Sequence, residues 1–117
     1  IKGAIRACSS ELYLMPGLYR GRTGIIAALI ALQEIGFDNS SLIEEHVKLL
    51  SDSAFEVDGN LHFAGDYLLR LSDDYGTGGA GVLCTLSCME TSPWNILPVV
   101  DASKLFCGNV NLKVERR

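Results

Sequence analysis

The sequence predicts a mainly α-helical fold made of two repeated units, and a doubled glycine-rich segment carries this prediction. Residues 17–24 read GLYRGRTG, residues 74–81 read DYGTGGAG, and each segment runs into an apolar stretch. Gly21 aligns with Gly78 at an offset of 57 residues, and the same offset aligns the glycines three positions later. A tight glycine turn that leads into an apolar helix, used twice, is typical of repeat architectures. Six turn glycines define the pattern: Gly17, Gly21, Gly24, Gly76, Gly78 and Gly81.

The first unit is predicted to contain a buried helix. Between Arg22 and Ile35 the sequence is apolar around most of the helical circumference, as expected for a helix that packs on several sides. Gly36 follows in the position typical of a helix C-terminal glycine. Residues 1–10 are only weakly specified by their small and apolar composition.

An amphipathic surface helix is predicted next, from about Leu42 to Ser53. Its apolar residues form one stripe, and its charged residues occupy the opposite face. Ser41, followed three residues later by Glu44, has the spacing of a capping box at the helix start. His46 falls on the apolar stripe, which predicts a partly buried histidine with satisfied polar atoms.

A small β-hairpin is predicted near residues 55–63, because Asp58-Gly59-Asn60 is a turn signal between two apolar segments. Residues 67–71 fit either a strand or a helical turn. The second glycine-rich segment then leads into a helix from about Ala80 to Met89. A further short helix is expected near residues 102–106.

The pattern indicates a single partial domain, with repeat 1 over about residues 16–73 and repeat 2 over about residues 74–117. Two repeats are fewer than the roughly three that repeat folds need for stability. We therefore expect the chain to belong to a larger toroid or solenoid, or to self-associate.

Composition favours a folded, acidic protein. Apolar residues make up 48% of the chain and the formal net charge is −4, which argues against a nucleic-acid or anionic-membrane surface. Basic residues cluster only at Arg20, Arg22 and residues 116–117, and we interpret these as solvated surface charge. The longest apolar stretch, residues 25–32, is too short to span a bilayer. No signal-peptide pattern is present at the N-terminus.

Four cysteines are too sparse for a disulfide framework, which favours a reduced, cytoplasmic protein. Cys84 and Cys88 are one helical turn apart, so together with His46 or His62 they offer the start of a zinc site. No Cys-X-X-Cys or Cys-His pair completes that site. We favour buried core cysteines, and we expect His62, in a turn-rich stretch, to be exposed.

The run from Gly76 to Gly81 also matches the dinucleotide fingerprint G-x-G-x-x-G, and Asp101 lies 20 residues after its last glycine. In a nucleotide fold such glycines let the backbone approach a pyrophosphate at a helix N-terminus. However, residues 72–75 separate the preceding strand from the glycines, and Pro98 interrupts the second strand that the fold requires. A small dinucleotide-binding module therefore remains an alternative to the repeat.

A polar cluster surrounds the second glycine turn. Asp73-Asp74 precedes Tyr75 and Thr77, and two roles fit this group. Its oxygens would cap the start of the following helix, or its side chains would line a site at that helix N-terminus. The Tyr19-Arg20 pair occupies the matching place in the first copy.

These motifs resemble a known family. Residues 17–29 resemble the glycine motif of lanthionine synthetase C-like proteins. Residues 69–83 are more closely similar to the C-terminal cyclase domain of the fused kinase–cyclase, class III type lanthipeptide synthetases. The similarity covers about residues 16–89.

The resemblance implies an (α/α) toroid of inner and outer helices, with the glycine turns bordering a central cavity. It also implies a lyase-type cyclase within a synthetase that modifies a precursor peptide. In that reaction Ser and Thr are phosphorylated and dehydrated, and a peptide Cys thiol then adds to the dehydroamino acid to close a thioether ring.

The resemblance carries over no zinc ligand. In the zinc-dependent members the metal lowers the pKa of the attacking thiol. Where those members carry a Cys-His pair in the glycine motif, this chain has Tyr19-Arg20, and its second motif has Gly76-Thr77. A zinc-independent cyclase with no cofactor in this chain is therefore the expectation.

We expect the chain to be the C-terminal part of the cyclase domain. It would supply part of the peptide cavity, together with the kinase and the remaining cyclase repeats, and form no ring alone. No catalytic residue is assigned. The candidate cavity-lining residues are Tyr19, Arg20, Tyr75 and Thr77. A non-catalytic helical interaction module is the other alternative, because a missing repeat leaves an apolar seam.

Overall fold

A computed structural model describes residues 2–10 and 12–90 of the chain. In chain order its elements are α1 (Lys2–Cys8), α2 (Arg22–Glu34), α3 (Ser40–Asp52), β1 (Phe55–Val57), β2 (Asn60–Ala64), the 3-10 turn η1 (Asp66–Leu68), β3 (Leu71–Ser72) and α4 (Gly79–Cys88). This confirms a mainly α fold with a small sheet. The short helix expected near residues 102–106 lies outside the described residues.

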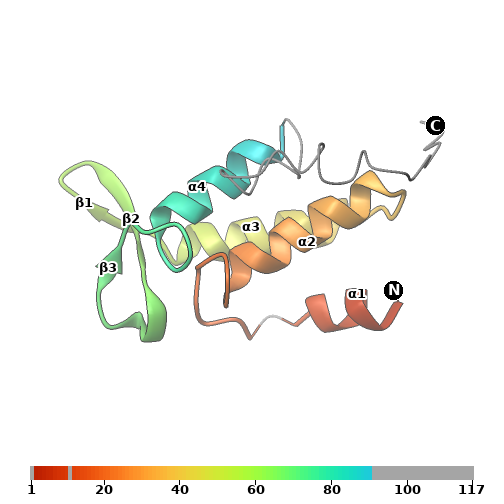
Figure 1. Cartoon of the computed structure of the whole chain (residues 1–117), viewed down its shortest axis with the longest axis horizontal. Helices are drawn as coiled ribbons and strands as arrows, with labels where there is room; N and C mark the ends of the chain where they lie inside the picture. Colours follow the sequence, from red (N-terminus) through yellow and green to blue (C-terminus); the bar gives the residue numbers. More distant parts are fainter. Residues whose placement is uncertain (1, 11, 91–117) are drawn as a thin grey trace, which may run out of the picture.

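Helix α2 is the centre of the core. It packs against α3, α4 and α1, and the small sheet lies at one end of the helices (Figure 1). Ile26 and Leu29 of α2 are fully buried, and so is Val82 of α4. Packing on several sides explains why apolar residues cover most of the α2 circumference. Gly36 follows the helix with φ of +100°, the left-handed geometry expected of a terminal glycine.

Helix α3 is the amphipathic helix that the sequence predicts, but its start differs from the prediction. The helix begins at Ser40, and the residue before it forms no side-chain capping bond. Instead, the Asp38 carboxylate accepts hydrogen bonds from the backbone N–H and the hydroxyl of Ser40, at 3.1 and 2.9 Å. Ser41 therefore lies inside the first turn, and the predicted capping box with Glu44 is wrong.

The three strands form an antiparallel sheet in the order β1-β2-β3. The predicted hairpin is confirmed, with Phe55 of β1 opposite His62 of β2. Asp58 and Gly59 have φ of 51° and 77°, the left-handed values that a two-residue type I′ turn requires at both positions. Residues 67–71, for which the sequence left two options, contribute both to η1 and to β3.

A buried polar network ties the N-terminal segment to the core. Arg22 is only 6% exposed, so its interpretation as solvated surface charge is wrong. Its guanidinium donates to the carbonyl of Tyr13 at 3.0 Å and contacts Nδ1 of His46 at 2.9 Å, while Nε2 of His46 lies 2.6 Å from the Cys8 carbonyl oxygen. Because a guanidinium can only donate, Nδ1 of His46 accepts and Nε2 carries the proton. His46 is thus buried and satisfied, as predicted, and it holds the end of α1, a helix that the sequence did not indicate.

Candidate functional site

The two glycine turns have the same backbone geometry at the starts of α2 and α4. A Cβ added to Gly21 would lie 2.3 Å from the carbonyl oxygen of Met15, and one added to Gly78 would lie 2.1 Å from that of Ser72. In both copies the carbonyl belongs to the residue six positions earlier. The glycines three residues later repeat this contact, at 2.3 and 1.9 Å from the carbonyl six positions before them. Only glycine tolerates such an approach, so the repeat seen in the sequence is a repeat of backbone contacts.

The two turns also pack directly against each other. We call residues 16–21 the first glycine loop and residues 74–78 the second glycine loop. The backbone N–H of Tyr19 donates to the carbonyl of Gly76 at 3.0 Å. A Cβ on Gly17 would lie 2.8 Å from Cα of Thr77, and a Cβ on Gly76 would lie 2.8 Å from the Tyr19 ring. Glycines on both sides therefore let the two loops touch through their backbones.

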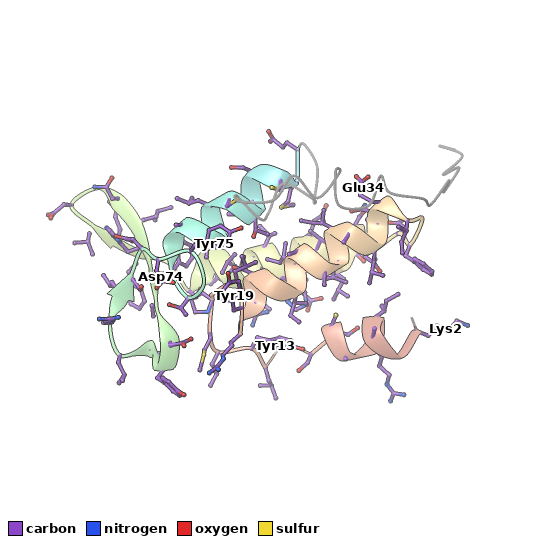
Figure 2. All side chains as sticks on the ribbon, viewed as in Figure 1. Lys2, Tyr13, Tyr19, Glu34, Asp74 and Tyr75 are labelled. Carbon is purple, nitrogen blue, oxygen red and sulfur yellow. The ribbon has the colours of Figure 1, made fainter. Side chains whose placement is uncertain are left out.

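A pair of tyrosines joins the loops on one side. The rings of Tyr19 and Tyr75 meet edge to face, with centroids 6.4 Å apart and an interplanar angle of 77° (Figure 2). The Tyr75 hydroxyl donates to Sγ of Cys84 at 3.9 Å. Burial, and then this bond, raises the pKa of Tyr75 to about 12. The phenol therefore stays protonated at neutral pH, where it acts as a donor and not as a base.

Asp74 closes the second glycine loop. Its carboxylate accepts hydrogen bonds from the Ser72 hydroxyl, from the Thr77 hydroxyl at 2.5 Å and from the Thr77 backbone N–H at 2.7 Å. These bonds, the Ser72 bond first, hold the pKa of Asp74 well below its usual range. Gly78, the residue before α4, receives no side-chain capping bond. Asp74 thus fastens the loop ahead of the helix and does not cap the helix itself.

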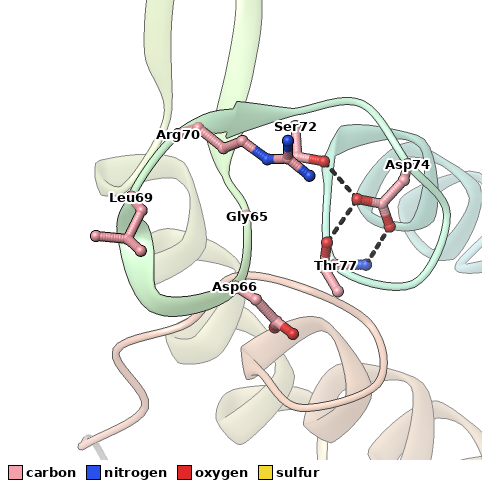
Figure 3. Close-up of a pocket in the computed structure, with 7 residues that line it drawn as sticks. All are labelled: Gly65, Asp66, Leu69, Arg70, Ser72, Asp74 and Thr77. Carbon is pink, nitrogen blue, oxygen red and sulfur yellow. Dashed lines mark hydrogen bonds between the residues drawn. The ribbon is translucent and has the colours of Figure 1, made fainter.

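A pocket of about 390 Å³ opens beside the second glycine loop (Figure 3). Its lining residues are Gly65, Asp66, Leu69, Arg70, Ser72, Asp74 and Thr77. Of the four candidate lining residues, only Thr77 borders this pocket; Tyr19 and Tyr75 pair with each other, and Arg20 is exposed. The part of the wall formed by Gly65, Asp66, Leu69 and Arg70 was not predicted from the sequence. The one signal for this wall in the sequence is a pair of opposite charges, Asp66 and Arg70, on either side of the apolar residues 67–69.

Comparison with known proteins gives no match: no family model, no curated protein and no solved structure is similar to the chain. In the described part of the chain, no helix is both long and apolar enough to cross a membrane.

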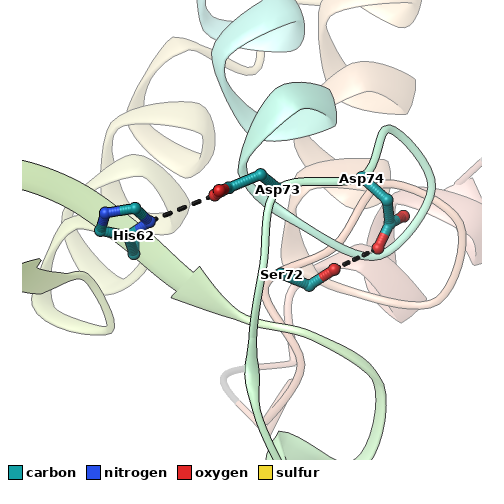
Figure 4. Close-up of polar contacts among 4 residues, drawn as sticks. All are labelled: His62, Ser72, Asp73 and Asp74. Atoms are coloured by element: carbon teal, nitrogen blue, oxygen red, sulfur yellow. Dashed lines mark hydrogen bonds and ion pairs between the residues drawn. The ribbon is translucent and has the colours of Figure 1, made fainter.

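The segment from Ser72 to Asp74 makes a second polar contact, between Asp73 and His62 of β2 (Figure 4). Nδ1 of His62 is 3.2 Å from Oδ1 of Asp73. His62 is half-buried, whereas the sequence predicts an exposed residue. Neighbouring carboxylates therefore serve different partners: Asp73 reaches β2, and Asp74 holds the glycine loop.

The Tyr19 ring packs over Gly76, so the two glycine loops meet through an aromatic side chain at this point. Within residues 2–10 and 12–90, no three His, Cys, Asp or Glu side chains are grouped to hold a metal. Cys88 is buried, and burial raises the pKa of its thiol, as expected of a core cysteine.

Proposed function

We propose that this chain forms part of the peptide cavity of a zinc-independent, cytoplasmic lanthipeptide cyclase domain with an (α/α) toroid fold. The observation that supports the proposal most is the pairing of two equivalent glycine loops at the starts of α2 and α4. In a toroid of inner helices, such loops would border the cavity from neighbouring repeats. The Tyr19–Tyr75 pair, Arg20 and Thr77 are the side chains that we assign to its wall.

The proposed role is binding, without assignment of a catalytic residue. Ring closure needs a group that takes the proton from a cysteine thiol, and a phenol with a pKa of about 12 does not supply one at neutral pH. Asp74 is engaged by three hydrogen bonds. We therefore assign proton transfer to residues elsewhere in the synthetase, which acts with this chain as its partner on the precursor peptide.

Geometry weighs against the dinucleotide alternative. A dinucleotide fold places its glycines between a parallel strand and a helix, whereas β3 is a two-residue strand antiparallel to β2. Gly76 and Gly78 are packed against the Tyr19 ring and the Ser72 carbonyl, so neither offers open backbone to a pyrophosphate.

One observation supports the alternative of a helical interaction module, namely the exposure of large apolar side chains. The same exposure also fits a chain that packs against further repeats. Large apolar side chains are well exposed on several elements, among them Leu61 of β2 and Leu83 of α4, at 65% and 59%. A contiguous patch of such side chains would mark contact with another protein or another copy.

The experiment uses a synthetic peptide that contains one dehydroalanine and one cysteine, titrated into the ¹⁵N-labelled chain. We expect amide shifts in both glycine loops, and weaker binding by Tyr19→Ala than by the exposed control Lys48→Ala. Mass spectrometry after thiol alkylation should show ring formation no faster than in buffer. Absence of loop shifts would overturn the cavity assignment, and accelerated ring formation would overturn the assignment of proton transfer to other residues. Shifts at residues 76–81 with NAD would favour the dinucleotide module.

A further inference from the structure

The pocket beside the second glycine loop has two kinds of wall. One wall is formed by Ser72, Asp74 and Thr77 and is internally satisfied, because both hydroxyl protons are donated to the Asp74 carboxylate. The oxygen lone pairs of those hydroxyls and the Asp74 charge remain available. This wall therefore offers acceptors, and it is fixed in place by its own hydrogen bonds.

Asp66 and Arg70 also line the pocket, and their charges are not satisfied within the described structure. In Figure 3 the Arg70 guanidinium extends toward Ser72, whereas Asp66 lies on the other side of Gly65 and its carboxylate is directed away from Arg70. Neither forms an ion pair or a side-chain hydrogen bond with any of the described residues. On an α-helix, opposite charges four positions apart lie on one face, but here Asp66 begins the 3-10 turn η1 and Arg70 directly precedes β3.

The backbone between them is left-handed at two positions. Tyr67 and Leu68 have φ of 59° and 58°, a left-handed geometry that costs a non-glycine residue on the order of 1–3 kcal/mol. The loop is closed by a hydrogen bond from the Gly65 N–H to the Arg70 carbonyl at 2.8 Å. The chain thus holds a strained turn that keeps Asp66 and Arg70 apart. Strain of this kind concentrates at binding sites, where surrounding structure maintains it.

The charge distribution indicates what would fill the space. A guanidinium pairs best with a carboxylate, through two parallel hydrogen bonds. Asp66 and Asp74 both line the pocket, so two carboxylates are available to a cation there. Leu69, 84% exposed, adds an apolar edge to the rim.

We propose that this pocket binds a peptide segment that carries one acidic and one basic side chain, the acid on Arg70 and the base between Asp66 and Asp74. The proposal rests on the proposed function only in naming a peptide as the occupant. It assigns the pocket to recognition of substrate sequence. The pocket therefore determines specificity and not reactivity.

The test uses four acetylated and amidated peptides, so that their termini carry no charge: Gly-Glu-Ser-Lys-Gly, and versions with Gln at the acidic position, at the basic position or at both. We expect the doubly charged peptide to bind the ¹⁵N-labelled chain about tenfold more tightly than either singly charged one. Its amide shifts should centre on Gly65, Arg70 and Thr77. Asp66→Asn and Arg70→Gln should each remove that preference, and added salt should weaken binding.

Matched controls are Asp52→Asn and Arg6→Gln, which change exposed charges of the same type at the ends of α3 and α1. Circular dichroism confirms that each variant is folded. Equal binding of all four peptides, shifts outside the pocket, or no binding at millimolar peptide overturns this proposal. None of these results touches the dehydroalanine titration, whose failure alone would overturn the proposed function.

Discussion

The two glycine loops share one backbone frame but are held by different chemistry. In the first copy, the Thr23 hydroxyl donates to the Pro16 carbonyl at 2.5 Å, and both residues are buried. At the matching position the second copy has Ala80, which cannot form this bond. There the exposed Asp74 fastens the loop instead.

The difference shows which parts of the motif are required and which are adaptable. The contact between glycine and the carbonyl six positions earlier is common to both copies, so the turn depends on it. The side chains that fasten the turn differ: Thr23 of the first copy is buried, whereas Asp74 of the second copy is exposed. The pocket described above lies beside the second copy.

The largest effect is expected when a methyl group is added where the glycine of each turn contacts the carbonyl six positions earlier. Gly21→Ala and Gly78→Ala each place a Cβ within 2.3 Å of a backbone carbonyl, which has no flexible end to move. We expect each to lower the free energy of unfolding by about 3 kcal/mol, measured by urea denaturation.

Gly3→Ala is the matched control for both changes. Gly3 lies in α1 with nothing within 4 Å of an added Cβ, so the substitution should stabilise by up to about 1 kcal/mol. If Gly78→Ala were as stable as the native chain, the close approach would not be what the turn requires.

A second change sharpens the contrast, because it acts on a buried group found only in the first copy. Arg22 is replaced by Gly79 in the second copy, and its guanidinium bonds to His46. His46→Phe removes an acceptor from a buried cation and the donor to the Cys8 carbonyl. We expect a loss of about 2 kcal/mol and faster amide exchange in α1.

Lys48→Ala on the exposed face of α3 is the control and should leave both measurements unchanged. Unaltered exchange in α1 of His46→Phe would contradict the role of this network in holding the N-terminal helix.

How much of this could be read from the sequence depended on whether the signal was local. Helices α2, α3 and α4, the Asp58-Gly59 turn and the doubled glycines all follow from patterns within a few residues. Gly21 and Gly78 each contact the carbonyl six positions earlier, and only glycine fits there. The repeat is therefore visible in the sequence as a repeated glycine spacing.

What the sequence did not predict depends on contacts between distant segments. The local sequence predicts a surface charge at Arg22. In the structure its guanidinium is enclosed by His46 and the Tyr13 carbonyl, which come from other segments. The pocket likewise needs the left-handed backbone at Tyr67 and Leu68, residues for which composition predicts no such geometry. Tertiary packing sets both features.

A smaller effect is expected where the two loops meet. A double-mutant cycle with Tyr19→Leu and Tyr75→Leu should give a coupling energy of about 1 kcal/mol, since the rings meet edge to face. The same cycle with the exposed Tyr67 in place of Tyr19 serves as control and should give none. Zero coupling between Tyr19 and Tyr75 would mean that the loops are held by their backbones alone.

The smallest effect tests the carboxylate that replaces buried packing in the second copy. Asp74 is exposed, so solvent screens its contribution. Its folded-state pKa lies below the unfolded value of 3.8, so its stabilisation is complete well above pH 3.8. The stabilisation begins to be lost near that pH and disappears only as the pH falls through the lower folded-state pKa. Asp74→Asn should therefore lose less stability than the native chain between pH 5 and pH 3, measured by urea midpoints. Thr77→Val removes one donor to the carboxylate, so its loss of stability over this pH range should fall between those of the native chain and Asp74→Asn. An identical pH dependence of stability for all three proteins would show that Asp74 does not couple the loop to protonation.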